Sequence, residues 1–340
     1  MTMATPILAV KNLTTTLEIQ EKEYRVVDNI SFDLHLGKTL AIVGESGCGK
    51  TLTALSIMRI LPKPPFFHPS GEVIYNQRNL LELKESEMRR LRGSKIAMIF
   101  QDPSTSLNPV YTIGDQLVET AELHLSLYGE EALEKAAHAL SEVGLARPWD
   151  LLEAYPHQLS GGMKQRIMIA LALLCEPDIL IADEPTTALD VTIQAQVLDL
   201  IRGLQKKKGM AVLLITHDMG VVAELADDVI VMYASQSVER GEVNQIFDHM
   251  AHPYTRGLFH SRPGVHSVRG ELKAIKGTVP PLTHYPAGCR FHPRCPFVME
   301  KCKQGPVPDF IIEEGPKHLS KCWLHDGSEE SALKMERVQE

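Results

Sequence analysis

Apolar and polar residues alternate in two segments near the start of the chain, Ile7–Leu13 and Asn29–Leu36. A period of two is typical of strands that bury one face. The uninterrupted apolar run Leu40–Val43 is of the kind that lies inside a parallel sheet. A glycine-rich loop follows it, and then a helical pattern from Lys50 to about Ile60. This order of strand, loop and helix predicts an α/β core.

A long helical block interrupts the strand pattern in the middle of the chain. From about Pro109 to Ala154 there are few strand-forming residues, and apolar residues recur at helical spacing. These apolar residues are Leu117, Ala121, Leu133, Ala137, Leu140 and Val143. Strand signals return at Ile179–Ala182 and Ala211–Thr216, each after a helical stretch. The alternation predicts an α/β sheet into which a helical subdomain, about residues 102–165, is inserted.

The composition changes near His249, where proline, glycine, histidine and cysteine become frequent and the periodicity fades. We therefore expect two domains, residues 1–248 and an irregular C-terminal extension of residues 249–340. Four of the six cysteines lie in this extension. In a cytoplasmic protein, such a group suggests metal or cluster ligation rather than disulfides.

Composition and charge narrow the range of functions. Hydrophobic residues make up 44% of the chain and charged residues 23%, as in ordinary globular proteins. The formal net charge of −8 argues against a nucleic-acid partner, because such proteins are usually basic. No apolar run reaches the roughly 18–20 residues that cross a bilayer, and no secretory signal is visible at the N-terminus. If the protein acts at a membrane, partners must hold it there.

The glycine-rich loop fits the pattern G-x-x-x-x-G-K-[ST] and lies between an apolar strand and a helix, as that pattern requires. Its residues are Gly44, Glu45, Ser46, Gly47, Cys48, Gly49, Lys50 and Thr51. Glycines let the backbone wrap around phosphate oxygens, and N–H groups at the helix start supply positive charge. We expect Lys50 to reach the β- and γ-phosphates of a nucleotide and Thr51 to bind Mg²⁺. The alternative is a chance glycine-rich turn, against which the strand–helix context argues.

Two carboxylates follow the apolar strand Ile179–Ala182. We expect Asp183 to hold Mg²⁺ and Glu184 to polarise the attacking water as a general base. A solvated acidic strand end would contain the same residue types. In combination with a phosphate loop, however, the pair predicts an enzyme that hydrolyses a nucleotide.

Residues Leu159–Arg166 match the pattern L-S-G-G-x-x-x-R, and with this motif the chain resembles the ABC ATPases. The resemblance implies a P-loop NTPase core of ABC type with an antiparallel β subdomain and an inserted helical subdomain. It also implies that Ser160, Gly161 and Gly162 contact the ATP held by a second subunit. A serine and two glycines at a helix start are an anion-binding arrangement. With one phosphate loop and one signature per chain, two composite sites would form in a head-to-tail dimer.

Further residues match ABC motifs in the family's order. Gln101 corresponds to the glutamine that senses the γ-phosphate and Mg²⁺, His217 to the histidine that contacts the γ-phosphate, and Asp190 to a residue that bridges the dimer. The family stacks adenine on an aromatic residue near the N-terminus, and we assign this role to Tyr24. The alternative is that Tyr24 is a surface residue and that Leu17 occupies the aromatic position.

The match extends to the dipeptide and oligopeptide (or nickel) importer branch of the ABC family. Four segments carry it: Gln101–Pro109, Ala182–Gln196, His252–Leu258 and Gly288–Pro296. It implies an ATPase subunit, with ATP and Mg²⁺, at the cytoplasmic face of the membrane. Its partners would be a second ATPase, identical or related, two transmembrane permeases and an extracytoplasmic peptide-binding protein. Uptake of nickel or another small solute, or a soluble ABC ATPase without a membrane role, are the alternatives.

Cys289, Cys295, Cys302 and Cys322 are separated by five, six and nineteen residues, which is not the C-x-x-C spacing of common zinc sites. Some relatives in the importer branch carry a [4Fe-4S] cluster on such an extension, and the resemblance implies the same cluster here. Zinc is the second candidate, because four thiolates bind either group. Reduced, buried structural cysteines are the third. A role in structure or partner docking is expected rather than a role in catalysis.

Two residues depart from the family's usual pattern. Ser235 stands where relatives usually have glycine, and a left-handed backbone there would cost about 1 kcal/mol. Cys48 replaces a common serine in the phosphate loop. A thiol near a helix N-terminus can have a lowered pKa and high reactivity. An inert small residue is the alternative that we favour.

Overall fold

The computed structural model describes residues 5–62, 67–102, 106–187, 190–261, 275–312 and 318–339. They fall into two compact units. The first unit comprises Met1–Ala9, Asp33–Thr39 and Val73–Ile215. The second comprises Val10–Phe32, Leu40–Glu72 and Thr216–Glu340. Within the described ranges, no helix is both long and apolar enough to cross a membrane.

A parallel sheet forms the centre of the first unit. Its strands are β6 (Ile96–Ile99), β7 (Ile179–Asp183) and β8 (Ala211–Thr216), and β7 pairs in parallel with both neighbours. Every residue of these strands is buried, which explains their uninterrupted apolar sequences. Helix α8 (Val191–Lys208) connects β7 to β8. The predicted strands and their alternation with helices are therefore confirmed.

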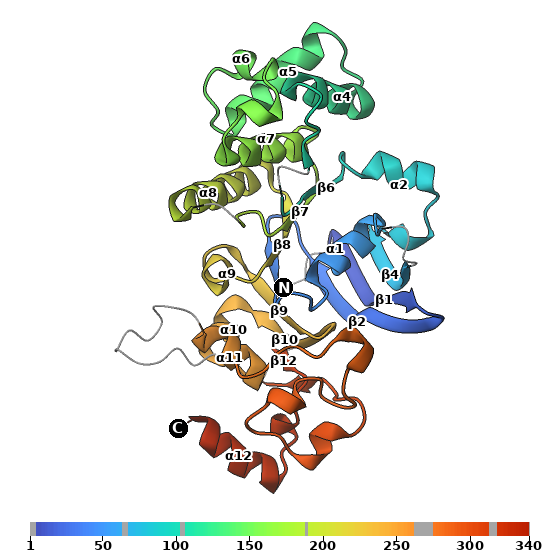
Figure 1. Ribbon diagram of the computed structural model, residues 1–340, viewed down its shortest axis with the longest axis vertical. Helices are drawn as coiled ribbons and strands as arrows, with labels where there is room; N and C mark the ends of the chain where they lie inside the picture. Colours follow the sequence, from blue (N-terminus) through green and yellow to red (C-terminus); the bar gives the residue numbers. More distant parts are fainter. Residues whose placement is uncertain are drawn as a thin grey trace. The chain divides into compact units, whose positions relative to one another are not determined.

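Four helices of the first unit form the inserted helical block. They are α4 (Ile113–Leu125), α5 (Glu130–Glu142), α6 (Pro148–Leu152) and α7 (Gly161–Leu173), and they pack on one another (Figure 1). Helix α4 begins after Thr112, whose hydroxyl accepts the Asp115 N–H while the Asp115 carboxylate accepts the Thr112 N–H, both at 3.0 Å. This reciprocal capping fixes the start of the helix. Of the predicted apolar positions, Leu133 is 39% exposed, whereas Leu117, Ala121, Ala137, Leu140 and Val143 are buried.

The second unit contains a mixed sheet in the order β11-β12-β10-β9-β3. Its strands are β3 (Thr39–Val43), β9 (Asp228–Tyr233), β10 (Gln236–Glu242), β11 (Phe310–Ile311) and β12 (Leu319–Ser320). Strands β3 and β9 are parallel, and β10 is antiparallel to β9 and β12. The helices of this unit are α1 (Lys50–Met58), α9 (Met219–Leu225), α10 (Val243–Asp248), α11 (Pro253–His260) and α12 (Glu329–Gln339).

A tight hairpin joins β9 to β10. Its two turn residues, Ala234 and Ser235, have φ angles of 45° and 70°. Two positive φ angles give the turn a twist that matches the flanking strands. The left-handed backbone considered for Ser235 is confirmed, and the serine therefore carries the expected cost of about 1 kcal/mol.

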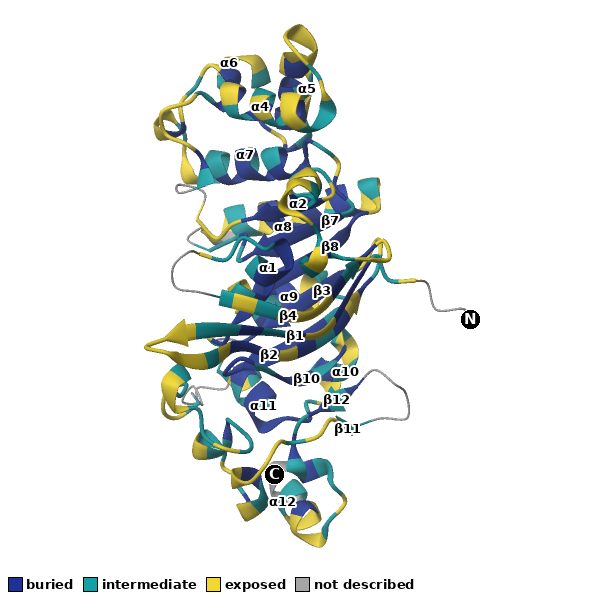
Figure 2. Ribbon diagram, turned by 90° about the vertical axis from the view of Figure 1, so that its right-hand side faces the viewer, coloured by how far each residue is buried: buried dark blue, intermediate teal, exposed yellow. Residues whose placement is uncertain are grey.

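Long strands of a second sheet carry the N-terminal alternation. They are β1 (Leu8–Ile19), β2 (Lys22–Leu34) and β4 (Phe67–Tyr75), in the order β2-β1-β4. Within the first unit, the end of β4 pairs with β5 (Arg78–Asn79), and helix α2 (Glu85–Leu91) follows. Exposed residues gather where β1 meets β2 (Figure 2, yellow). The strands are longer than predicted. Their outer residues are exposed on both faces, so the sequence there does not alternate between apolar and polar residues.

The C-terminal extension packs on the mixed sheet through an aromatic cluster in the second unit. The ring of Tyr233 at the end of β9 lies 4.7 Å from that of Tyr254 and 5.2 Å from that of Phe291. Tyr233 and Tyr254 are fully buried, and Phe291 is 2% exposed. Burial of three aromatic side chains supplies several kcal/mol of stabilisation. Residues on both sides of the predicted boundary at 248 therefore belong to one compact unit.

Candidate functional site

The phosphate loop joins β3 to α1 in the second unit, and two of its glycines, Gly44 and Gly49, sit where no side chain fits. A Cβ atom on Gly44 would lie 2.2 Å from the Met232 carbonyl oxygen, and one on Gly49 would lie 2.5 Å from that of Val26. Gly49 also has a φ of 100°, which favours glycine. The loop is thus pressed closely against neighbouring backbone, and its shape is fixed by packing.

The lysine of the loop is buried within it. Lys50 is 5% exposed, and its ammonium group donates to the carbonyl oxygens of Gly44 (2.9 Å) and Glu45 (3.2 Å). Burial raises the pKa of the neighbouring Cys48 thiol and outweighs the opposing charge of Lys50. The thiol therefore stays protonated, which favours the inert interpretation of Cys48 over the reactive one.

Gln101 and Thr187 meet the carboxylate that directly follows β7 in the first unit. Asp183, the last residue of β7, is 2% exposed. The next residue, Glu184, accepts hydrogen bonds on Oε2 from Gln101 Nε2 and from Thr187 Oγ1, both at 2.9 Å. Its N–H donates to the Ile215 carbonyl oxygen at 2.8 Å. Two motifs separated by 83 residues are thereby joined, and Thr187 is a partner that the sequence did not single out.

Glu184 also has a backbone φ of 46°. For a residue with a side chain, such a conformation costs on the order of 1–3 kcal/mol and is found where a site requires it. Together with the two side-chain donors, this backbone fixes the direction of the carboxylate. The arrangement suits a general base that must hold a water molecule in one orientation.

The signature motif caps helix α7. The hydroxyl of Ser160 accepts the Met163 N–H at 3.3 Å, so the serine is the N-cap residue. Ser160 and Gly161 are exposed and Gly162 is partly exposed, which leaves this helix start open to solvent. Farther along α7, the buried side chain of Gln165 donates to the Pro185 carbonyl oxygen at 2.5 Å. Gln165 ties the signature helix to the segment that follows Glu184, a link that the sequence did not reveal.

The remaining predicted nucleotide contacts are exposed or half-buried. Asp190 is the N-cap of α8, and its carboxylate accepts the Ile193 N–H at 3.0 Å. Ala188 and Leu189, which precede it in the motif, lie outside the described residues. His217 is exposed directly after β8. Tyr24 is half-buried on β2, and its role against adenine stays a prediction.

The four cysteines of the extension line one small cavity in the second unit, together with side chains that include His252, Met299 and Trp323. All four are free thiols. Burial raises the pKa of Cys289 to about 11 and that of Cys295 to about 12, and neighbouring thiols add to both shifts. Among the described residues, no group of three or more His, Cys, Asp or Glu is arranged to hold a metal ion.

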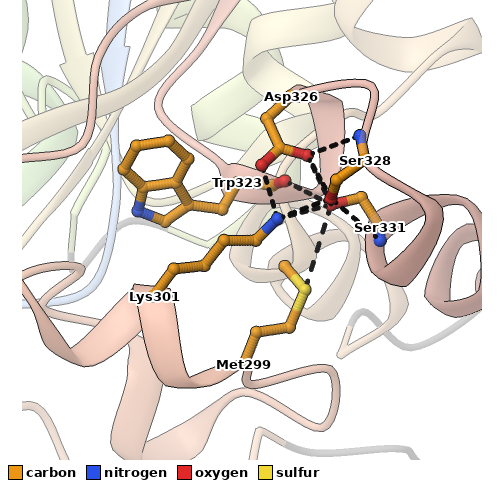
Figure 3. A network of polar contacts seen from close by, with 6 residues as sticks. All are labelled: Met299, Lys301, Trp323, Asp326, Ser328 and Ser331. Atoms are coloured by element: carbon orange, nitrogen blue, oxygen red, sulfur yellow. Dashed lines mark hydrogen bonds and ion pairs between the residues drawn. The ribbon is translucent and has the colours of Figure 1, made fainter.

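A polar network supports one wall of this cavity (Figure 3). The Ser331 hydroxyl oxygen lies 2.8 Å from the carbonyl oxygen of Trp323 and 2.6 Å from the Asp326 carboxylate, and its one hydrogen is donated to one of these two acceptors. The ammonium group of Lys301 lies against Asp326 and donates to Ser331 at 3.0 Å. Burial acts to raise the pKa of Asp326, but hydrogen bonds, of which the one from Lys301 is the strongest, hold this pKa well below its usual range. The network fixes Trp323 and Met299, both of which line the cavity.

Comparison with known proteins gives two family matches. The ABC transporter family matches residues 27–187, and the oligopeptide/dipeptide transporter C-terminal region matches residues 238–302. A probable peptide ABC transporter ATP-binding protein of Sinorhizobium fredii is 50% identical over 93% of this chain and 94% of its own length. The dipeptide transport ATP-binding protein DppD of Bacillus subtilis is 47% identical over 96% of this chain and 97% of its own length.

Solved structures give the same result for the fold. The ATP-binding cassette MJ0796, in a dimeric post-hydrolysis state bound to ADP and Pi, matches with a TM-score of 0.62 and 27% identity. The match covers 69% of this chain and 98% of that structure. CbiO1 from Clostridium perfringens, part of the cbiONQ ABC transporter complex, matches with a TM-score of 0.61 and 27% identity, over 73% of this chain and 92% of its own.

Proposed function

This chain belongs to the ABC transporter family, and we propose that it is the ATPase subunit that energises peptide uptake across the cytoplasmic membrane. It binds and hydrolyses ATP, as the ABC domain and the ATP-binding relatives establish. The observation that carries the hydrolytic role is the Glu184 carboxylate, held by Gln101 and Thr187 beside the buried Asp183. The Sinorhizobium and Bacillus relatives are named for peptide and dipeptide transport, which favours peptides over nickel as the cargo.

Each residue of the site has a distinct chemical task in this proposal. The N–H groups of the loop Gly44–Thr51, apart from that of Glu45, which donates to Tyr254, bind the phosphates together with the Lys50 ammonium. Thr51, Gln101 and Asp183 provide oxygen ligands for the Mg²⁺ that an ABC ATPase uses. Glu184 accepts a proton from the attacking water, and His217 contacts the γ-phosphate. Tyr24 stacks against the adenine ring.

Two copies, or this chain and a related ATPase, form the working pair. The exposed start of helix α7 supports this, because Ser160 and Gly161 have free access to a second subunit's nucleotide. Asp190 lies exposed at the start of α8 and bridges the pair. Two transmembrane permeases hold the pair at the cytoplasmic face of the membrane, and an extracytoplasmic peptide-binding protein delivers the peptide. The domain division at residue 248 belongs to the same proposal.

The four-cysteine cavity is proposed to hold a [4Fe-4S] cluster. The four free thiols that line one cavity support this, because a [4Fe-4S] cluster takes a Cys₄ ligand set. Zinc remains the second candidate, since four thiolates bind either group. Iron and sulfide analysis of the chain purified without air tests this. Iron should be present in the wild type and in Cys175→Ser and lost in Cys302→Ser, and a wild type without iron would refute it.

The transport role is tested by affinity purification of the tagged chain from gently solubilised membranes, followed by mass spectrometry. Two multi-spanning permeases, an ATPase partner and a peptide-binding protein are the expected companions. Cell fractionation should place the chain in the membrane pellet only when the permeases are present. Recovery with ribosomes or nucleic-acid factors, and without membrane proteins, would contradict the transport role and leave the ATPase assignment standing.

A further inference from the structure

An arginine of the C-terminal extension holds the side chain of a phosphate-loop residue. Arg294 Nη1 lies 2.7 Å from Glu45 Oε2, and Arg294 Nη2 lies 3.1 Å from Glu45 Oε1. This is the two-pronged geometry in which an arginine binds a carboxylate most strongly. The Arg294 side chain is 6% exposed and the Glu45 side chain is 26% exposed. The pair is therefore largely shielded from solvent, and its strength exceeds that of a surface ion pair.

The extension also binds the main chain of the same loop residue. The N–H of Glu45 donates to the hydroxyl oxygen of Tyr254 at 2.8 Å. Tyr254 lies on helix α11 and is fully buried. Two elements of the extension, separated by about 40 residues of sequence, thus meet at one position of the phosphate loop. In both contacts, the partner on the phosphate loop is Glu45.

Contacts within the extension also hold the guanidinium group of Arg294 in place. Its Nε donates to the Lys276 carbonyl oxygen at 3.0 Å, and its Nη2 donates to that of Gly277 at 3.2 Å. Its guanidinium also lies 5.7 Å from the centre of the Tyr233 ring. A guanidinium held in this way loses little entropy when it binds a carboxylate. The extension therefore presents a rigid cation to the loop.

Glu45 creates a difficulty for ATP binding that this cation resolves. The loop binds phosphates through N–H groups that must converge on an anion. Glu45 carries a carboxylate on the same loop, and its negative charge opposes the binding of a triphosphate there. Arg294 offsets that charge, and Tyr254 fixes the orientation of the backbone that carries it.

We propose that Arg294 and Tyr254 are positioning residues of the nucleotide site, which makes the C-terminal extension a working part of ATP binding. The proposal depends on ATP binding at this loop and is independent of the solute that is transported. Arg294 directly precedes Cys295, one of the four cysteines of the cavity. The segment that carries the cysteines is thereby mechanically joined to the phosphate loop.

The test measures the affinity of the full chain for a fluorescent ATP analogue, together with kcat and KM for ATP. Arg294→Ala should weaken nucleotide binding by about 10-fold, which corresponds to 1.4 kcal/mol, and should raise KM much more than it lowers kcat. Arg294→Lys should recover part of the loss. Lys303→Ala is the matched control. It removes an exposed ion pair with Glu300 in the same extension and should leave both constants unchanged.

A second substitution separates positioning from a merely structural role. If Arg294 acts by offsetting the Glu45 charge, adding Glu45→Gln to Arg294→Ala should restore affinity to within about 3-fold of Glu45→Gln alone. A defect that Glu45→Gln does not relieve, or wild-type affinity in a folded Arg294→Ala protein, would overturn the proposal. If Arg294→Ala fails to fold, Tyr254→Phe decides, since it removes only the acceptor of the Glu45 N–H. Tyr254→Phe should weaken nucleotide binding several-fold, and unchanged binding would contradict the proposal. A wild-type chain that binds no ATP would instead count against the ATPase assignment.

Discussion

The ion pair between Asp28 and Arg290 is expected to be a major anchor of the C-terminal extension. Asp28 on β2 is 4% exposed. Its carboxylate accepts hydrogen bonds from Arg290 Nη2 at 2.5 Å, Gln236 Nε2 at 2.8 Å and Arg25 Nη1 at 3.0 Å. Arg290 also donates to the Ala234 carbonyl oxygen at 2.5 Å. Arg290→Met would keep most of the side-chain volume and remove both interactions.

The expected cost follows from the burial of the carboxylate. Removing one partner of a buried ion pair costs about 3–5 kcal/mol, because a charge is left without compensation. The Arg25 side chain remains, but it is 63% exposed and compensates weakly. We therefore expect Arg290→Met to lower the free energy of unfolding by about 3 kcal/mol at neutral pH. The double variant Asp28→Asn/Arg290→Met should recover a large part of this, because no buried charge remains.

Urea unfolding followed by tryptophan fluorescence measures this effect. The chain has two tryptophans, and Trp149 in the first unit is 54% exposed. A Trp149→Phe background therefore leaves Trp323 to report on the second unit alone. Lys303→Met, which removes an exposed ion pair of the extension, is the control and should shift the midpoint little.

The pH dependence of stability tests the same ion pair, Asp28 with Arg290, in a second way. Burial acts to raise the pKa of Asp28, but hydrogen bonds from Gln236 and the charge of Arg290 hold it below its usual value of 3.8. A lowered pKa stabilises the folded state above pH 3.8, and this stabilisation is lost as the pH falls through the folded-state pKa. The gap between wild type and Arg290→Met should therefore narrow below about pH 4. Equal urea midpoints at pH 7, or a gap that does not change in acid, would refute this reasoning.

Three further predictions concern the loop, the extension and the carboxylate site. Gly49→Ala places a Cβ atom 2.5 Å from the Val26 carbonyl oxygen, at a position with a φ of 100°. In a binding titration it should weaken nucleotide binding at least about 10-fold. Gly203→Ala is the control, because a Cβ atom at this position in helix α8 has nothing within 4 Å. Burial lowers the pKa of His252 from 6.5 to about 4, against the charge of Glu239, so thermal stability should fall as the pH drops from 6.5 to 4, by roughly 3 kcal/mol. His252→Asn keeps an N-cap acceptor and should flatten that profile, and an unchanged profile would contradict the assignment. Thr187→Val removes a donor to Glu184 and should lower kcat about 10-fold with KM for ATP nearly unchanged; a change in KM alone would point to a binding role instead.

Local pattern was enough to predict the parts of the site that depend on neighbouring residues. The phosphate loop, the strand that ends at Asp183 and the helix start at Ser160 are each defined by residues a few positions apart. At Ser235 the sequence indicated only what a left-handed backbone would cost, and the positive φ itself is a finding of the structure.

Long-range contacts could not be predicted in this way. The bond from Gln101 to Glu184 joins residues 83 positions apart, and the ion pair from Arg294 to Glu45 joins residues 249 positions apart. No periodicity records such a pairing. The extension lacked a clear pattern because short turns around a buried aromatic cluster, and not long amphipathic elements, hold it together. In the same way, Leu133 follows the helical spacing but faces solvent. Spacing shows which residues share one face of a helix, but it does not show what packs against that face.

The most direct test of the central claim is the turnover of Glu184→Gln, measured as phosphate release beside the affinity for a fluorescent ATP analogue. The substitution keeps the size of the side chain and its contact with Thr187 while it removes the proton acceptor. The account predicts nucleotide binding within a few-fold of wild type and turnover reduced by about 100-fold or more. Normal turnover in a variant that binds ATP would contradict the assignment of Glu184 as the general base, and with it the site on which the proposed function is built.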